Sequence, residues 1–151
     1  MPQYARPDAD EAGNSFQNQA ASNSNMYQSI DEAVANDSDY IVSAKNPTNN
    51  VYVCHLTAVD DPLVDTGHVI NFRYKKDVAV NAEQIDLVVQ LRQDYIEETG
   101  GGANLGTLIA QTSVTNISSS FANGQYTLSN AEAGSISAYG NLHLRFIFNK
   151  P

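Results

Sequence analysis

The closing part of the chain constrains the fold most strongly. Between residues 142 and 148, every second side chain is large and apolar: Leu142, Leu144, Phe146 and Phe148. A period of two with bulky residues on one face is typical of a strand with one side against a core. Ile147 breaks the pattern, because it lies on the otherwise polar face with His143 and Arg145. We therefore expect a sheet that packs against a second layer.

A short helical crossing is predicted before this strand. Ser129, followed three residues later by Glu132, has the sequence pattern of a capping box. We expect the crossing to run from residue 129 to about residue 139, where Gly140 ends it. Its expected inward side chains are Ala131, Ala133 and Ile136.

Six further segments have strand patterns separated by turn signals: 40–43, 51–56, 67–75, 84–93, 107–114 and 124–128. Segment 84–93 is the clearest, and its polar face includes one apolar residue, Val88. Val69 holds the same kind of position in segment 67–75. The pattern predicts an all-β protein, an antiparallel β-sandwich or jelly roll with little helix.

The first 29 residues differ in composition from the rest. Asn, Gln, Ser and Ala dominate there, so the segment cannot by itself bury enough apolar surface to offset its ordering entropy. It is either a free tail or an arm that orders on a partner. We assign residues 1–29 to an extended N-terminal arm and residues 30–151 to the β-sandwich domain. The expected contacts of the arm are Tyr4, Arg6, Phe16, Met26 and Tyr27.

Charge and hydropathy limit the expected partners. The chain has 8 basic and 17 acidic residues, a net charge of −9, and shows no basic face for nucleic acid. The acidic excess lies mainly in residues 1–65, which indicates either solubility or a surface for a positively charged partner. No stretch reaches the roughly 20 apolar residues of a membrane span. The first residues lack the features of a signal peptide, so we expect synthesis in a cytoplasm.

Residues that could carry chemistry do not form a motif. Cys54 lies in an apolar run and reads as a small buried hydrophobe. His55, His68 and His143 lack metal-ligand spacing. Asp60, Asp61 and Asp65 share one loop and are weak calcium candidates, although a solvated loop is the alternative. We therefore expect no enzyme activity and no cofactor.

Several short motifs resemble, in their order, those of small β-sandwich proteins encoded among the structural genes of tailed bacteriophages. The motifs are ArgProAsp at 6–8, TyrGlnSerIleAspGlu at 27–32, AspSerAspTyrIle at 37–41, AspPro at 61–62, ThrGlyHisVal at 66–69, ArgTyrLysLys at 73–76, AspLeuValValGlnLeu at 86–91, TyrThrLeuSerAsnAlaGluAla at 126–133 and AsnLeuHisLeuArgPhe at 141–146. Together they span most of the chain.

The resemblance implies a structural protein of the virion. Its leading form is a capsid decoration, or cement, protein on the outer surface of the head, made in the host cytoplasm and bound to the major capsid protein. Similar proteins are oligomers, often trimers, so a homotrimer is expected. Val69, Val88 and Ile147 are the candidates for a subunit interface, because each is apolar on a polar strand face.

The alternative is a glycan- or receptor-binding module of a phage tail or fibre. Such a module predicts a groove lined by aromatic side chains. The candidates are Tyr52, Tyr95, Tyr126 and Tyr139.

Overall fold

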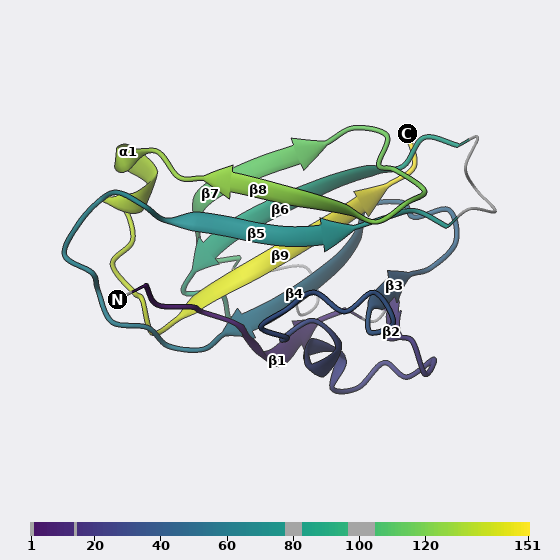
Figure 1. The fold of residues 1–151 in the computed structure, drawn as a ribbon, viewed down its shortest axis with the longest axis horizontal. Coiled ribbons are helices and arrows are strands. Elements are labelled where there is room, and N and C mark those ends of the chain that lie inside the picture. The colour runs from purple at the N-terminus through teal and green to yellow at the C-terminus, as the bar shows by residue number, and fades with distance from the viewer. Residues whose placement is uncertain (1, 14, 78–82, 97–104) are drawn as a thin grey trace.

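A computed structural model describes residues 2–13, 15–77, 83–96 and 105–151, and it is mostly β-structure (Figure 1). The strands are β1 (Pro7–Ala12), β2 (Phe16–Asn18), β3 (Ile41–Ser43), β4 (Asn50–Leu56), β5 (Val69–Tyr74), β6 (Asp86–Gln93), β7 (Thr107–Val114), β8 (Ala122–Thr127) and β9 (Leu142–Asn149). A 3-10 turn, η1 (Met26–Ser29), follows β2, and a short helix, α1 (Asn130–Ala133), precedes β9. The predicted all-β class is confirmed, and β1 and β2 are additional strands that the sequence analysis did not identify.

The strands form two layers. Five strands make one antiparallel sheet in the order β1-β4-β9-β6-β7. The antiparallel pair β5–β8 lies across one face of that sheet as the second layer (Figure 1). A small pair, β2–β3, stands at one end. The molecule is therefore an antiparallel β-sandwich, as the alternation of apolar residues predicted.

The core lies between the layers, on the face of the sheet that carries the alternating apolar residues of β9. Phe146 of β9 is paired with Tyr52 of β4 on one side and with Val89 of β6 on the other. Because directly paired residues share a face, these side chains form one row of the core. Cys54, on the same face, is completely buried, and burial raises the pKa of its thiol to about 12. Its predicted role as a buried hydrophobe is confirmed.

The predicted capping box before β9 is present. Ser129 accepts a hydrogen bond from the Glu132 backbone N–H, and the Glu132 carboxylate accepts one from the Ser129 backbone N–H. The helix itself is shorter than predicted, because it ends at Ala133. Ala133 and Ile136 are buried as expected, whereas Ala131 is exposed.

The described part of the N-terminal segment packs into the sandwich and does not extend from it as the predicted arm. β1 pairs along β4, and Phe16 and Met26 are only 1% and 2% exposed in the core. The Phe16 ring packs 5.7 Å from the Tyr52 ring and 5.8 Å from the Phe148 ring, measured between centroids. The sequence had left open a free tail or an arm that orders on a partner. The apolar residues of the segment instead bury against strands of the same chain that lie far away in the sequence.

One carboxylate fixes the path of this segment. Asp10 of β1 accepts hydrogen bonds from the backbone N–H groups of Met26 and Tyr27, both at 2.7 Å. It also accepts one from the Tyr52 hydroxyl at 2.7 Å. Burial raises the pKa of Tyr52 well above its usual value, so the hydroxyl remains a donor. Asp10 thereby joins β1, η1 and β4 around one buried ring.

Candidate functional site

Three apolar side chains form a row across the outer face of the five-stranded sheet, away from the core. Ile147 of β9 is paired directly with Val51 of β4 and with Val88 of β6. All three residues are half-buried. We call them the apolar row. Apolar side chains on a sheet face that lies opposite the core are a feature of interaction surfaces.

The register of the sheet brings the apolar row together. Val88 and Ile147 were each identified from the sequence as breaks in a polar face, but nothing in the sequence placed them side by side. Val51 was not identified as a site residue. Its signal lay in the alternation of segment 51–56, because Tyr52 and Cys54 turn to the core and Val51 must then face the other way.

Two arginines lie next to the apolar row on the same face. Arg145 of β9 and Gln90 of β6 are directly paired. They lie two residues along their strands from the Ile147–Val88 pair and therefore on the same face. The side-chain oxygen of Gln90 accepts from Arg92 Nε at 2.8 Å and from Arg145 Nη1 at 3.3 Å, and its amide donates to Gln111 at 2.6 Å. The network holds two cationic groups beside an apolar strip, a combination that suits the core of a protein interface.

Two histidines, His55 of β4 and His143 of β9, are paired on the same face, two residues beyond Arg145 along β9. His55 Nδ1 lies 2.6 Å from an Asp8 carboxylate oxygen, and His143 Nε2 lies 3.8 Å from Glu11. The two imidazole rings are 4.9 Å apart in an edge arrangement, and Tyr95 packs on His143 at 5.3 Å. His143 is 2% exposed, and burial, helped by the neighbouring His55, lowers its pKa. The cluster attaches β1 to the central strands.

Val69, the third predicted interface residue, lies elsewhere. It belongs to β5 in the second layer, where it is paired with Thr127 and is 41% exposed. The structure therefore brings Val88 and Ile147 together and leaves Val69 apart from them.

The predicted arm contacts separate into core and surface residues. Phe16 and Met26 belong to the core, so they are not free to contact a partner. Tyr27 is half-buried in η1. Tyr4 is 68% exposed, and the Arg6 guanidinium lies 5.4 Å from the centroid of its ring. Tyr4 and Arg6 thus remain accessible as a small surface feature.

The acidic loop of Asp60, Asp61 and Asp65 does not gather its carboxylates around one point. The backbone of Asp60 exchanges two hydrogen bonds with the Gln3 side chain, at 2.8 and 3.0 Å. Asp61 accepts from the Leu63 backbone N–H at 2.7 Å, which forms a local turn. In the described part of the chain, no group of three or more His, Cys, Asp or Glu side chains is arranged to hold a metal ion.

The proposed aromatic groove is not formed. Tyr52 and Tyr95 are 0% and 5% exposed, so neither can present a face to a ligand. Tyr126 and Tyr139 are half-buried, and the Tyr126 hydroxyl donates to Glu132 at 2.8 Å. Tyr52 faces the core from β4, Tyr95 packs on His143, and Tyr139 contacts His68, so these rings serve packing within the molecule.

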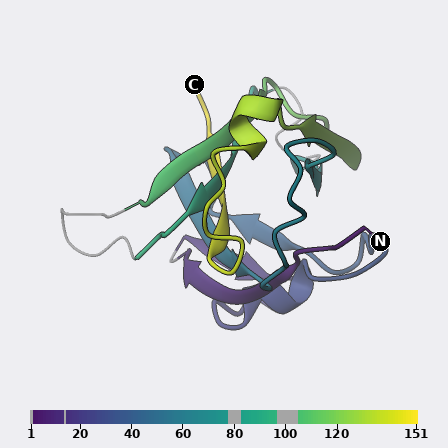
Figure 2. The same ribbon diagram turned by 90° about the vertical axis from the view of Figure 1, so that its left-hand side faces the viewer.

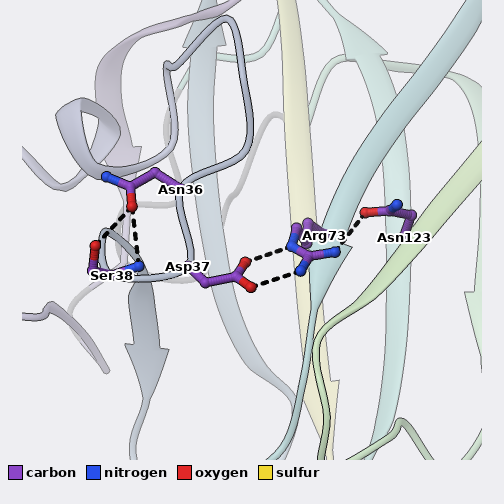
Figure 3. Close-up of polar contacts among 5 residues, drawn as sticks. All are labelled: Asn36, Asp37, Ser38, Arg73 and Asn123. Atoms are coloured by element: carbon purple, nitrogen blue, oxygen red, sulfur yellow. Dashed lines mark hydrogen bonds and ion pairs between the residues drawn. The ribbon is translucent and has the colours of Figure 1, made fainter.

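An exposed ion pair ties the segment before β3 to the second layer (Figure 3). The Arg73 guanidinium donates two hydrogen bonds to the Asp37 carboxylate, at 2.5 and 2.7 Å, and a third to Asn123 at 2.8 Å. This guanidinium holds the pKa of Asp37 below its usual value. Asn36 accepts two hydrogen bonds from Ser38, which shape the turn. The turn lies on the side of β5 that faces away from β8 (Figure 3).

A polar cleft of about 400 Å³ lies between β2, η1 and the segment before β3. Its lining consists of amide, hydroxyl and carboxylate side chains, among them Asn18, Gln19, Asn25, Gln28 and Asp39. The Asp39 Oδ1 atom is buried there without a hydrogen-bond partner. The cleft can take a polar, hydrogen-bonding ligand in preference to an apolar one.

Comparison with known proteins adds no relative. No protein-family model, no curated protein and no solved structure matches this chain. The described residues include no helix that is long and apolar enough to cross a membrane. The likeness to phage structural proteins rests on the sequence motifs alone.

Proposed function

We propose that this chain is a structural protein of a tailed phage that binds the outer surface of the capsid and stabilises it. The observation that carries the proposal is the apolar row on the outer sheet face, together with the motifs that resemble phage β-sandwich proteins. The partner is the major capsid protein.

The outer face has the composition of a contact surface. The three central strands carry adjacent apolar side chains on this face: Val51, Ile147 and Val88. Arg92 and Arg145 beside them supply side chains that are enriched at the centres of protein interfaces. A rigid sheet loses little conformational entropy on binding, so even a modest contact area repeated over many copies can hold a shell.

Two valines provide a matched test of this surface. Val88→Glu places a charge in the apolar row, and Val69→Glu makes the same change in the other layer. We expect Val88→Glu to abolish binding to purified capsids in a co-sedimentation assay and Val69→Glu to leave it unchanged. Unfolding curves of both variants check that each is folded. Equal binding by the two folded variants would reject the outer face as the contact.

The location in the virion is tested separately. Quantitative peptide mass spectrometry of purified particles gives the copy number of this protein relative to other virion proteins. A copy number that tracks the major capsid protein supports decoration of the head. A number that tracks tail proteins instead contradicts it. The homotrimer that the resemblance implies stays a prediction, checked by the mass of the free protein in solution.

The polar cleft favours one alternative, a glycan- or receptor-binding module of a tail or fibre. Amide and carboxylate side chains such as Asn25 and Asp39 can hydrogen-bond sugar hydroxyls. A glycan array, followed by titration of any hit against Asn25→Ala, tests this function. Binding that requires Asn25, together with a tail-like copy number, would favour the alternative over decoration.

A further inference from the structure

The two edges of the five-stranded sheet differ in how well they are protected from pairing with a further strand. β1, at one edge, carries Pro7 and three carboxylates, and its pairing with β4 is interrupted by two register shifts. η1 packs beside it through the Asp10 hydrogen bonds. Proline, charge, irregular pairing and a covering turn are the devices that prevent a sheet edge from pairing with another strand.

β7, at the other edge, has fewer of these devices. Its sequence TLIAQTSV contains no charge, no proline and no glycine over eight residues. Among the described residues, β7 pairs with β6 and with no other strand. The pairing of β7 with β6 has one register shift, where Ile109 of β7 is an extra residue, and it is regular from Ala110 to Val114. Leu108 is 45% exposed, and Gln111 and Ser113 are also exposed. An uncharged edge with a regular run such as Ala110–Val114 is a template for strand addition.

The charge pattern of the chain indicates what pairs there. Residues 105–131 contain no Asp, Glu, Lys, Arg or His, in a chain whose net charge is −9. This stretch includes β7 of one layer and β8 of the other, and both strands run along the same side of the sandwich (Figures 1 and 2). At this side two copies can approach without repulsion between like charges.

The open edges of the second layer support the same choice. The turn at 36–38 is bound to Arg73 on the free side of β5. Another segment of the same chain therefore already lies beside the β5 edge (Figure 3). β8 has its free edge on the same side of the sandwich as β7 and is uncharged as well (Figure 1). Among the described residues, no strand pairs with the free edge of β7 or of β8.

We propose that the chain forms a two-fold dimer in which β7 pairs antiparallel with β7 of a second copy. A two-fold axis perpendicular to the sheet keeps the inner faces of both copies on the same side. It joins the two five-stranded sheets into one, and it also extends the outer face that carries the apolar row. Because β1 blocks the opposite edge, the assembly closes at two copies and does not grow into a fibre. This inference does not rest on the proposed function. It differs from the homotrimer that the resemblance implies, and the mass of the free protein decides between the two.

Adding a charge to the β7 edge tests the dimer. Gln111→Glu adds a carboxylate to β7 while keeping the oxygen that accepts from Gln90, and Gln17→Glu adds the same charge to an exposed position of β2. Sedimentation equilibrium should give wild-type protein twice the 16.4 kDa of one chain. Gln111→Glu should raise the dimer dissociation constant on the order of tenfold or more, and less at high salt. Gln17→Glu should leave it unchanged.

Disulfide trapping locates the contact. Cys54 is the only cysteine and is buried, so Gln111→Cys, Ser113→Cys and Gln17→Cys each introduce one accessible thiol. In a two-fold β7–β7 pairing, one or two positions of β7 lie within disulfide distance of the same position in the second copy. Oxidation should therefore crosslink at β7 and not at Gln17. A wild-type protein that is monomeric or trimeric up to its solubility limit would overturn the proposal. So would a dimer that is insensitive to Gln111→Glu and crosslinks equally at Gln17.

Discussion

Phe16 offers the sharpest test of how the N-terminal segment is held. Its ring is 1% exposed and packs against Tyr52 and Phe148, far from it in the sequence. Replacing a fully buried Phe by Ala typically costs about 3–5 kcal/mol, because apolar burial is lost and a cavity remains. We therefore expect Phe16→Ala to destabilise the isolated protein by that amount. An arm that orders only on a partner would make the same change almost neutral.

Urea unfolding followed by circular dichroism measures the effect. With a slope of about 2 kcal/mol per molar urea, a loss of about 4 kcal/mol lowers the midpoint by roughly 2 M. Tyr4→Ala is the matched aromatic control, because Tyr4 is 68% exposed. It should cost less than about 1 kcal/mol, including any contribution from Arg6 over its ring. If Phe16→Ala costs no more than Tyr4→Ala, the docking of the N-terminal segment is refuted.

Two further predictions concern buried polar groups. Tyr52→Phe removes the hydroxyl that donates to Asp10 and should cost about 1.5–3 kcal/mol in urea unfolding, with Asp10→Asn costing less in the Tyr52→Phe background than alone. Additive costs would contradict a shared hydrogen-bond network. The lowered pKa of His143 means that the unfolded chain binds a proton there at higher pH than the folded chain. Stability should therefore fall as the pH drops below about 6.5, and His143→Gln should show a smaller fall between about pH 7 and pH 5. Equal falls in both proteins would show that His143 does not contribute.

The sequence alone was sufficient where structure depends on near neighbours. The alternation in 142–148 predicted β9 and its core face, and Ser129 with Glu132 predicted a capping box that the structure contains. Each of the seven strands predicted from residue 40 onward is present within two residues of its predicted bounds. These features follow from side-chain periodicity and from hydrogen bonds that span a few residues, both of which are visible in a local stretch of sequence.

The candidate surface could be predicted only in part. Val88 and Ile147 were visible as apolar residues on polar strand faces, but their pairing depends on which strands are neighbours and in which register. Val69 has the same local signal and lies in the other layer. The predicted aromatic groove was wrong for a similar reason. The burial of a tyrosine depends on what packs over it and not on its local sequence.

The sequence by itself determined the strands from residue 40 onward, the cap before β9 and the acidic character of the chain. Only the tertiary structure decided that the Asn- and Ser-rich N-terminal segment belongs to the core. Asp10 and Phe16 reach Tyr52, 42 and 36 positions away, and no local pattern records such partners. The tertiary structure also decided that β7 is an edge strand. Whether an uncharged strand lies in the centre or at the edge of a sheet depends on strand order, which is set by the packing of the whole chain.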